Sequence, residues 1–339
     1  MKYKNLIANL YSTVKALFLL FIISSYSSNA FAQEIHAREN ELAKDTIIKF
    51  DPDSASGFYY AYFIRLPKGT KVNAPQFLLV ETNNSGANDS LAFHERETYL
   101  EVIKNSLGSS LCKNLKVPFL VPVFPRPKKD WKYYTHALDR DVALIKDGSM
   151  KRLDEQLIAM TKHAKLQLQK MGILINEKIM LNGFSASGSF ANRFTFLHPE
   201  LVAAVACGGI NAIPMLPVKT LESSKLIYPI GIYDYQKLFS DTVHLTAYKK
   251  VPQFIYMGGK DENDAVLFDD AYSDKERAII YKCLGKTMQP DRWIKCQDIY
   301  KKELVNATFK TYGNIGHQTD KEVFVDVSAF FSRTMQVSR

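Results

Sequence analysis

The chain has 339 residues, with 44 Lys and Arg against 35 Asp and Glu, which gives a formal net charge of +9 at pH 7. This length suits one large domain or two small ones. The basic residues are spread out, and the densest block, Arg126-Pro127-Lys128-Lys129, is typical of a solvated loop. Because the sequence contains no nucleic-acid-binding motif, we expect no nucleic acid among its partners.

The N-terminus has the three parts of a secretory signal peptide. Lys2, Lys4 and Lys15 precede the apolar block 16–23, and Ala30-Phe31-Ala32 supplies the small residues of a cleavage site. We predict cleavage after Ala32, so that residues 1–32 are the signal peptide and 33–339 the secreted or periplasmic domain. An uncleaved anchor is the alternative, but a membrane span needs about 20 apolar residues. We therefore expect no stable membrane anchor after cleavage.

Two strands are predicted first in the mature chain. Residues 46–50 and 58–66 are rich in β-branched and aromatic side chains and are separated by turn residues, which indicates an antiparallel pair. Beyond them, short apolar runs alternate with amphipathic segments. The apolar runs predict strands at 77–80, 119–124, 179–181, 202–207, 254–257 and 309–312.

The amphipathic segments predict helices. Residues 151–171 give the clearest pattern, with apolar side chains three or four apart and Gly172 at the position of a C-terminal cap. The same alternation predicts helices at 95–115, 187–197, 264–284 and 321–331. Continuous apolar strands separated by helices indicate an α/β fold, with a mostly parallel sheet covered by helices on both faces.

Residues 183–188, Gly-Phe-Ser-Ala-Ser-Gly, lie between a predicted strand and a predicted helix. This context is typical of a nucleophile elbow, in which a strained turn presents a serine to solvent. The residues two before and two after that serine must be small; Gly183 is, whereas Ser187 replaces the usual glycine, which follows as Gly188. A polar turn with Ser185 as helix N-cap is the alternative. The flanking strand and helix favour the elbow, with Ser185 as nucleophile.

Residues 211–250 interrupt the alternation of strands and helices. This segment follows the sixth predicted strand and contains three prolines and several aromatic residues, which indicates an insertion over the end of the sheet. In sheets of this kind, sites form beyond the carboxyl ends of the strands, so the insertion is a candidate lid or pocket wall. An ordinary packing element is the alternative.

A serine nucleophile needs a base, and the base needs an acid that fixes its tautomer. His317 follows the last predicted strand in a glycine-containing loop and is the predicted base, with His94 and His136 as weaker candidates. The acid is expected after the strand at 254–257. Asp261 is the first choice and Asp264 the alternative, although Asp264 precedes a predicted helix and is also a candidate N-cap.

The Ser, Asp, His order, the elbow and the two loops resemble the α/β-hydrolase superfamily over most of the mature chain. Within it, the elbow region is similar to secreted esterases of the polyhydroxyalkanoate-depolymerase and feruloyl-esterase kind. The resemblance implies a triad of Ser185, Asp261 and His317, and an oxyanion hole. One donor would be the backbone N–H of Ala186, and the other would come from Asn83 or Asn84 in the loop 81–86.

Four cysteines, Cys112, Cys207, Cys283 and Cys296, do not form a dense framework. In an exported chain disulfides are an option, and Cys283 and Cys296 are close enough in sequence to bridge a local loop. Cys207 ends an apolar run and is typical of a small buried side chain. No cysteine spacing indicates a zinc site.

These observations predict a secreted serine hydrolase that cleaves carboxylic esters, small or polymeric, through an acyl-enzyme. The chemistry requires no metal and no organic cofactor. Two alternatives stay open: a peptidase of the same fold, because the same triad cleaves amides, and an exported binding protein that has kept the fold without catalysis. The sequence leaves the oligomeric state open.

Overall fold

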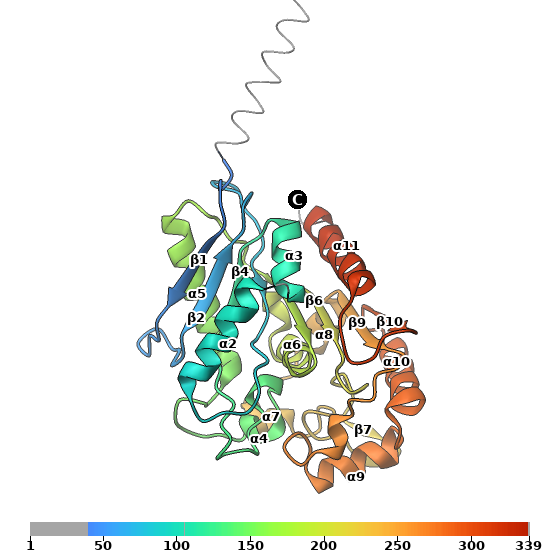
Figure 1. The fold of residues 1–339 in the computed structure, drawn as a ribbon. Helices are drawn as coiled ribbons and strands as arrows, with labels where there is room; N and C mark the ends of the chain where they lie inside the picture. Colours follow the sequence, from blue (N-terminus) through green and yellow to red (C-terminus); the bar gives the residue numbers. More distant parts are fainter. Residues whose placement is uncertain (1–39, 105, 338–339) are drawn as a thin grey trace, which may run out of the picture.

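The computed structural model describes residues 40–104 and 106–337, so the predicted signal peptide lies outside the described residues. The main sheet has eight strands in the order β1-β2-β4-β3-β5-β6-β9-β10 (Figure 1). Their bounds are β1 Thr46–Phe50, β2 Tyr62–Leu66, β3 Leu79–Val80, β4 Phe119–Pro122, β5 Ile179–Phe184, β6 Val202–Gly208, β9 Gln253–Gly258 and β10 Ala307–Tyr312.

The sheet is mostly parallel, as predicted. β2 pairs antiparallel with β1 and with β4, and all pairings from β4 to β10 are parallel. Strands in the middle of the sheet are buried on both faces, and successive side chains enter two different cores: Phe119 and Val121 point into one, and Leu120 into the other. This explains why these strands read as continuous apolar runs.

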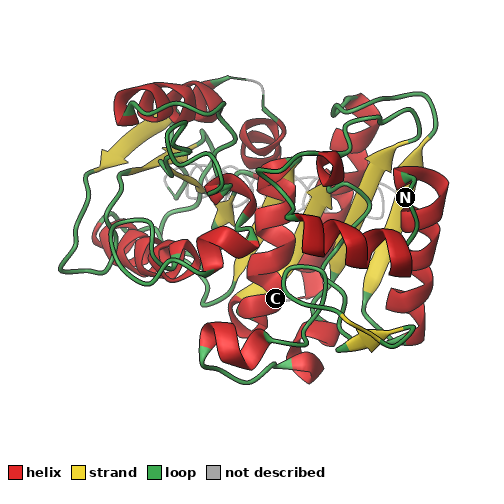
Figure 2. Ribbon diagram, turned by 90° about the horizontal axis from the view of Figure 1, so that it is seen from below, coloured by secondary structure: helices red, strands yellow, loops and turns green. Residues whose placement is uncertain are grey.

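Helices cover both faces of the sheet (Figures 1 and 2). α2 (Leu91–Ile103), α3 (Leu107–Leu115) and α11 (Lys321–Val337) contribute buried side chains to one core. α5 (Leu153–Lys170), α6 (Ala186–Leu197), α8 (Leu245–Lys250), α9 (Asp274–Cys283) and α10 (Trp293–Lys302) contribute to the other. The expected three-layer arrangement is therefore confirmed.

Two predicted helices differ from the structure in extent, and one helix of the structure was not predicted. The helix expected at 95–115 is two helices, because Ser106 caps α3 by accepting a hydrogen bond from the Ser109 N–H. The helix expected at 264–284 is limited to α9, which begins with a capping box formed by Ser273 and Glu276. α10 was not predicted, although Trp293 and Cys296 are buried on its inner face.

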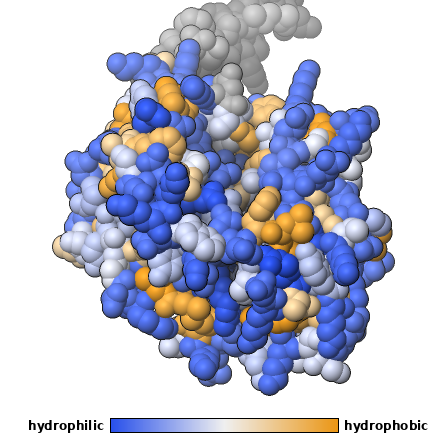
Figure 3. Space-filling model, turned by 60° about the horizontal axis from the view of Figure 1, so that its bottom comes forward, coloured by the Kyte–Doolittle hydropathy of each residue, from blue (hydrophilic) through white to orange (hydrophobic). Residues whose placement is uncertain are grey.

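The segment 211–250 holds the hairpin of β7 (Thr220–Leu221) and β8 (Ser224–Lys225), then α7 (Tyr235–Phe239) and α8. Its aromatic side chains are largely in the core: Tyr228, Tyr235 and Tyr248 are buried. Much of the segment is thus a packing element, and its action as a lid stays a prediction. The face that Figure 3 brings forward is mainly hydrophilic, with hydrophobic residues in small separate groups.

All four cysteines are free and buried, so the disulfide considered between Cys283 and Cys296 is wrong. The two side chains lie on α9 and α10 and pack as apolar groups in the same core. Over residues 40–104 and 106–337, we find no helix of the length and apolarity that a membrane crossing requires.

Candidate active site

Ser185 lies in the turn between β5 and α6, in a strained backbone conformation with φ 61° and ψ −124°. A non-glycine residue holds such angles only where its surroundings impose them. The close approach of strand and helix does so here: a Cβ on Gly183 would lie 2.3 Å from the carbonyl oxygen of Ser187. The turn therefore has the geometry of the predicted elbow.

Ser187, the departure from the usual glycine, has a structural use. Its hydroxyl accepts a hydrogen bond from the backbone N–H of Phe184 at 3.0 Å and donates one to the Phe184 carbonyl at 2.9 Å. The close contact that glycine provides is one residue later, where a Cβ on Gly188 would meet the Gly208 carbonyl oxygen at 2.7 Å. Ser187 therefore stabilises the turn through hydrogen bonds, while Gly188 permits the close approach of the helix to β6.

His317 and Asp261 come together at the carboxyl ends of β10 and β9. The Nδ1 atom of His317 lies 2.9 Å from Oδ2 of Asp261, whose side chain is 1% exposed. The other carboxylate oxygen accepts the backbone N–H of Asn263 at 2.9 Å. Because a carboxylate only accepts, Nδ1 of His317 carries the proton and Nε2 holds the lone pair that a general base needs.

The histidine ring is held beside the elbow by packing. It lies against the ring of Phe184, the residue before Ser185, with centroids 4.7 Å apart. On the same side, a Cβ on Gly209 would lie 2.9 Å from the His317 ring, and Gly209 has φ +61°. A larger residue there would displace the ring, so glycine at 209 is part of the site.

Asn263 is a site residue that the sequence did not indicate. Its Nδ2 atom lies 3.0 Å from Nε2 of His317, where it donates to the lone pair. It comes from the same loop as Asp261, and it is exposed. No local motif marks it, because its contact joins residues 54 positions apart.

Asp264, the alternative acid, is engaged elsewhere. Its Oδ2 forms an ion pair with Arg292 at 2.5 Å, and that arginine is fully buried. Its Oδ1 accepts the backbone N–H of Val266 and caps a short 3-10 turn. The structure therefore brings Asp261, and not Asp264, to His317.

The two predicted oxyanion asparagines, Asn83 and Asn84, both lie in the loop after β3, but one side chain is buried and the other is exposed. The side chain of Asn83 is buried and bonded to the backbone N–H and carbonyl of Phe124. Asn84 is exposed, and its Nδ2 lies 3.4 Å from the carbonyl oxygen of Phe184 in the elbow. Ala186 is the first residue of α6, where backbone N–H groups lack helical partners.

The two weaker histidine candidates, His94 and His136, contact side chains of this loop. Ser85 Oγ lies 2.7 Å from Nδ1 of His94, and Nε2 of His136 is 2.9 Å from the Phe124 carbonyl oxygen. Both rings are fully buried. Burial lowers the pKa of His136 to about 3, which makes it a neutral structural residue.

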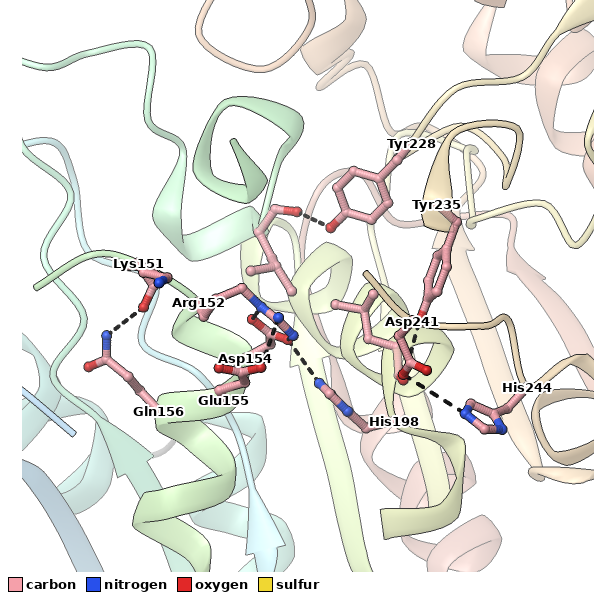
Figure 4. A network of polar contacts seen from close by, with 12 residues as sticks. Lys151, Arg152, Asp154, Glu155, Gln156, His198, Tyr228, Tyr235, Asp241 and His244 are labelled. Atoms are coloured by element: carbon pink, nitrogen blue, oxygen red, sulfur yellow. Dashed lines mark hydrogen bonds and ion pairs between the residues drawn. The ribbon is translucent and has the colours of Figure 1, made fainter. Parts of the chain in front are cut away.

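A separate polar network lies at the other end of α6, as Figure 4 shows. The buried Asp154 accepts from Nε2 of His198 at 2.9 Å and from Arg152 at 2.6 Å. Burial would raise the pKa of Asp154, but these two partners hold it at about 2. The network ties α5 to the end of α6 and does not include Ser185.

A cavity of about 290 Å³ opens beside Ser185 and Ala186. Its walls come from α6, from the loop after β4 and from the loop that carries Asn263. They combine charged and aromatic groups, among them Arg126, Tyr134, Arg193, Asp270 and Tyr272. Asn211 also lines it, at the start of the segment 211–250.

No family model matches the sequence, and no curated protein matches it either. Solved structures do match. One is titled as a poly(aspartic acid) hydrolase from Sphingomonas sp. KT-1, with a TM-score of 0.54, 14% identity, and coverage of 86% of this chain and 98% of that one. Another is titled as a poly(3-hydroxybutyrate) depolymerase from Bordetella parapertussis, with a TM-score of 0.51, 14% identity, and coverage of 86% and 91%. Together with the sheet order, these matches show the α/β-hydrolase fold.

Proposed function

We propose that this protein is an exported serine hydrolase that cleaves carboxylic esters, with Ser185 as nucleophile, His317 as general base and Asp261 as the acid. The observation that carries the proposal is the hydrogen bond between His317 and Asp261 beside a strained serine turn. That bond fixes the tautomer that can take a proton at Nε2.

The reaction proceeds in two halves. The His317 Nε2 atom removes the Ser185 hydroxyl proton as Oγ attacks the ester carbonyl, and the protonated ring then gives that proton to the leaving alkoxide. Water, deprotonated by the same nitrogen, attacks the acyl-enzyme and releases the carboxylic acid. In both halves the negative oxygen is stabilised by the Ala186 N–H and by a donor from Asn83 or Asn84.

Asn263 has to leave Nε2 for this chemistry, because one lone pair cannot accept from both an amide and the serine. Its exposure and its place on a loop permit this rearrangement. The structural neighbour named as a poly(3-hydroxybutyrate) depolymerase supports a hydrolase whose substrate is a small or polymeric ester. The other neighbour is named for poly(aspartic acid), whose units are joined by amide bonds, so the peptidase alternative is tested alongside.

Export is part of the proposal and rests on the N-terminal sequence. Expression of the full chain in a host with a secretory pathway should yield a protein that begins at Gln33, as read by N-terminal sequencing. A protein retained in the membrane with its N-terminus intact would contradict cleavage after Ala32.

Hydrolysis of p-nitrophenyl acetate and butyrate tests the activity. Ser185→Ala should lower kcat by at least about 10⁴-fold, because the nucleophile is lost. Ser110→Ala is the matched control, since Ser110 is half-buried like Ser185 but lies on α3 and does not line the cavity. Activity retained in Ser185→Ala would refute the nucleophile, and a parallel assay on peptides would distinguish an esterase from a peptidase.

A further inference from the structure

The cavity beside Ser185 follows one face of α6. Ser185, Ser189 and Arg193 all line it, and their spacing of four residues places them on the same side of the helix. Arg193 lies eight residues beyond Ser185, which corresponds to about 12 Å of helix rise between the Cα atoms. The cavity therefore extends from the nucleophile to a guanidinium group.

Arg193 is a buried cation without an ion pair to a described carboxylate. The residue is 4% exposed. It donates from Nη1 to the carbonyl of Ala137 at 2.7 Å and from Nη2 to the hydroxyl of Tyr272 at 3.2 Å, both neutral acceptors. Burying a charge without a counter-charge costs free energy. Binding of an anion next to Arg193 would therefore be favourable.

Two buried acids, Asp139 and Glu276, interact electrostatically with Arg193 but form no ion pair with it. Burial raises the pKa of Asp139 to about 8, so at neutral pH its protonated form prevails. Burial also raises the pKa of Glu276, which accepts from the backbone N–H and hydroxyl of Ser273 in the capping box. Neither acid accepts a hydrogen bond from Arg193, whose acceptors are the Ala137 carbonyl and the Tyr272 hydroxyl.

Arg126 adds a second guanidinium to the same cavity. It stacks over the ring of Tyr134 at 3.7 Å from the centroid and pairs with Asp270 at 2.7 Å. Both partners line the cavity too. With Arg126 balanced by Asp270, the charge of Arg193 leaves the cavity with a net positive charge.

Three lysines, Lys128, Lys129 and Lys132, follow Arg126 in sequence. None of them lines this cavity, and Lys129 and Lys132 line a separate hollow with Trp131. The positive charge of the cavity therefore comes from the two arginines.

We propose that the substrate of this site is an anionic ester, whose carboxylate is bound by Arg193 and Arg126 while its ester carbonyl lies at Ser185. The inference rests on the proposed hydrolase function. Arginine suits this task because its planar group matches a carboxylate with two parallel hydrogen bonds. Tyr134 and Tyr272 supply apolar walls for the carbon chain between the two ends.

The test compares esters that differ only in charge. The first pair is the mono-p-nitrophenyl ester of adipic acid and the same ester with its far carboxylate converted to an amide. The second pair, acetyl esters of 4-hydroxybenzoate and 4-hydroxybenzamide, places the carboxylate on the alcohol side. We expect kcat/KM to be roughly 10 to 100 times higher for the anionic member of one pair, the effect of a charged hydrogen bond. The preferred pair identifies the side of the ester that carries the charge.

Variants connect this preference to the arginines. Arg193→Gln and Arg126→Gln should each lower the anionic-to-neutral ratio by about tenfold or more. Asp270→Asn should raise it, because Arg126 loses its partner. Arg140→Gln is the matched control: Arg140 is 21% exposed and paired with Asp234, much as Arg126 is 18% exposed and paired with Asp270, but it does not line the cavity.

The outcomes separate the two proposals. If the wild-type protein hydrolyses both members of each pair equally, the anionic substrate is refuted and the hydrolase stands. If it hydrolyses none of the four esters, both proposals fail. If Arg193→Gln does not fold by circular dichroism, Arg126→Gln and Asp270→Asn decide, and an unchanged ratio in both refutes the inference.

Discussion

Replacing each of the two aspartates after β9 by asparagine should separate catalysis from stability. In Asp261→Asn, Oδ1 still accepts the Asn263 N–H, but the group facing Nδ1 of His317 becomes an amide that donates. His317 must then accept at Nδ1 and carry its proton on Nε2, so it cannot take the Ser185 proton. We expect kcat to fall by about 10³ to 10⁴, which is about 4 to 5.5 kcal/mol in the activation free energy.

Asp264→Asn should have the opposite profile. It removes the counter-charge of the fully buried Arg292, paired at 2.5 Å, and breaking a buried pair costs roughly 3 to 5 kcal/mol of unfolding free energy. Its kcat on p-nitrophenyl butyrate should stay within about threefold of wild type, because His317 keeps its partner.

Steady-state kinetics and urea unfolding on the same preparations check both variants. The expected result is a loss of kcat without a large loss of stability in Asp261→Asn, and the reverse in Asp264→Asn. A fall in kcat of a thousandfold in Asp264→Asn, with Asp261→Asn near wild type, would refute the assignment of the acid.

Three further predictions concern the elbow, a buried acid and the thiols. Gly183→Ala should destabilise the protein by about 1 to 3 kcal/mol and impair esterase turnover, because its Cβ would lie 2.3 Å from the Ser187 carbonyl oxygen; wild-type urea unfolding and turnover would contradict this. The pKa of Asp139, raised by burial to about 8, means that its stabilising proton is lost as pH rises toward and through that value. Asp139→Asn should therefore gain unfolding free energy relative to wild type between pH 5 and 9 in urea titrations, and parallel pH profiles would refute this. Ellman's reagent should find no rapidly reacting thiol in the folded protein and four after denaturation, since the cysteines are free and buried; fewer than four would indicate a disulfide.

The strands were predictable because burial on both faces leaves a direct mark on sequence. A strand such as Phe119–Pro122 sends alternate side chains into two cores, and both must be apolar. The break between α2 and α3 was harder to place, because a single cap at Ser106 decides it. α10 carries a usable signal in Trp293, Cys296 and Tyr300, which recur at three and four residues.

At the candidate site, sequence order was enough to predict that two residues after strand ends would meet. His317 and Asp261 both follow strands of the parallel sheet, so their meeting could be expected. Asn263 and Arg193 could not be identified in this way, since their significance depends on contacts made only in the folded chain. The partner of Asp264, Arg292, is likewise 28 positions away and separated from it by α9.

The central claim is that Ser185 is an activated nucleophile, and a fluorophosphonate probe tests it most directly. Only a serine whose proton can be removed by a neighbouring base reacts with such a probe at neutral pH. Mass spectrometry of the labelled, folded protein should find one adduct, on the peptide that contains Ser185, and Ser185→Ala should not be labelled. Folded wild-type protein that stays unlabelled, or an adduct on another serine, would contradict the account.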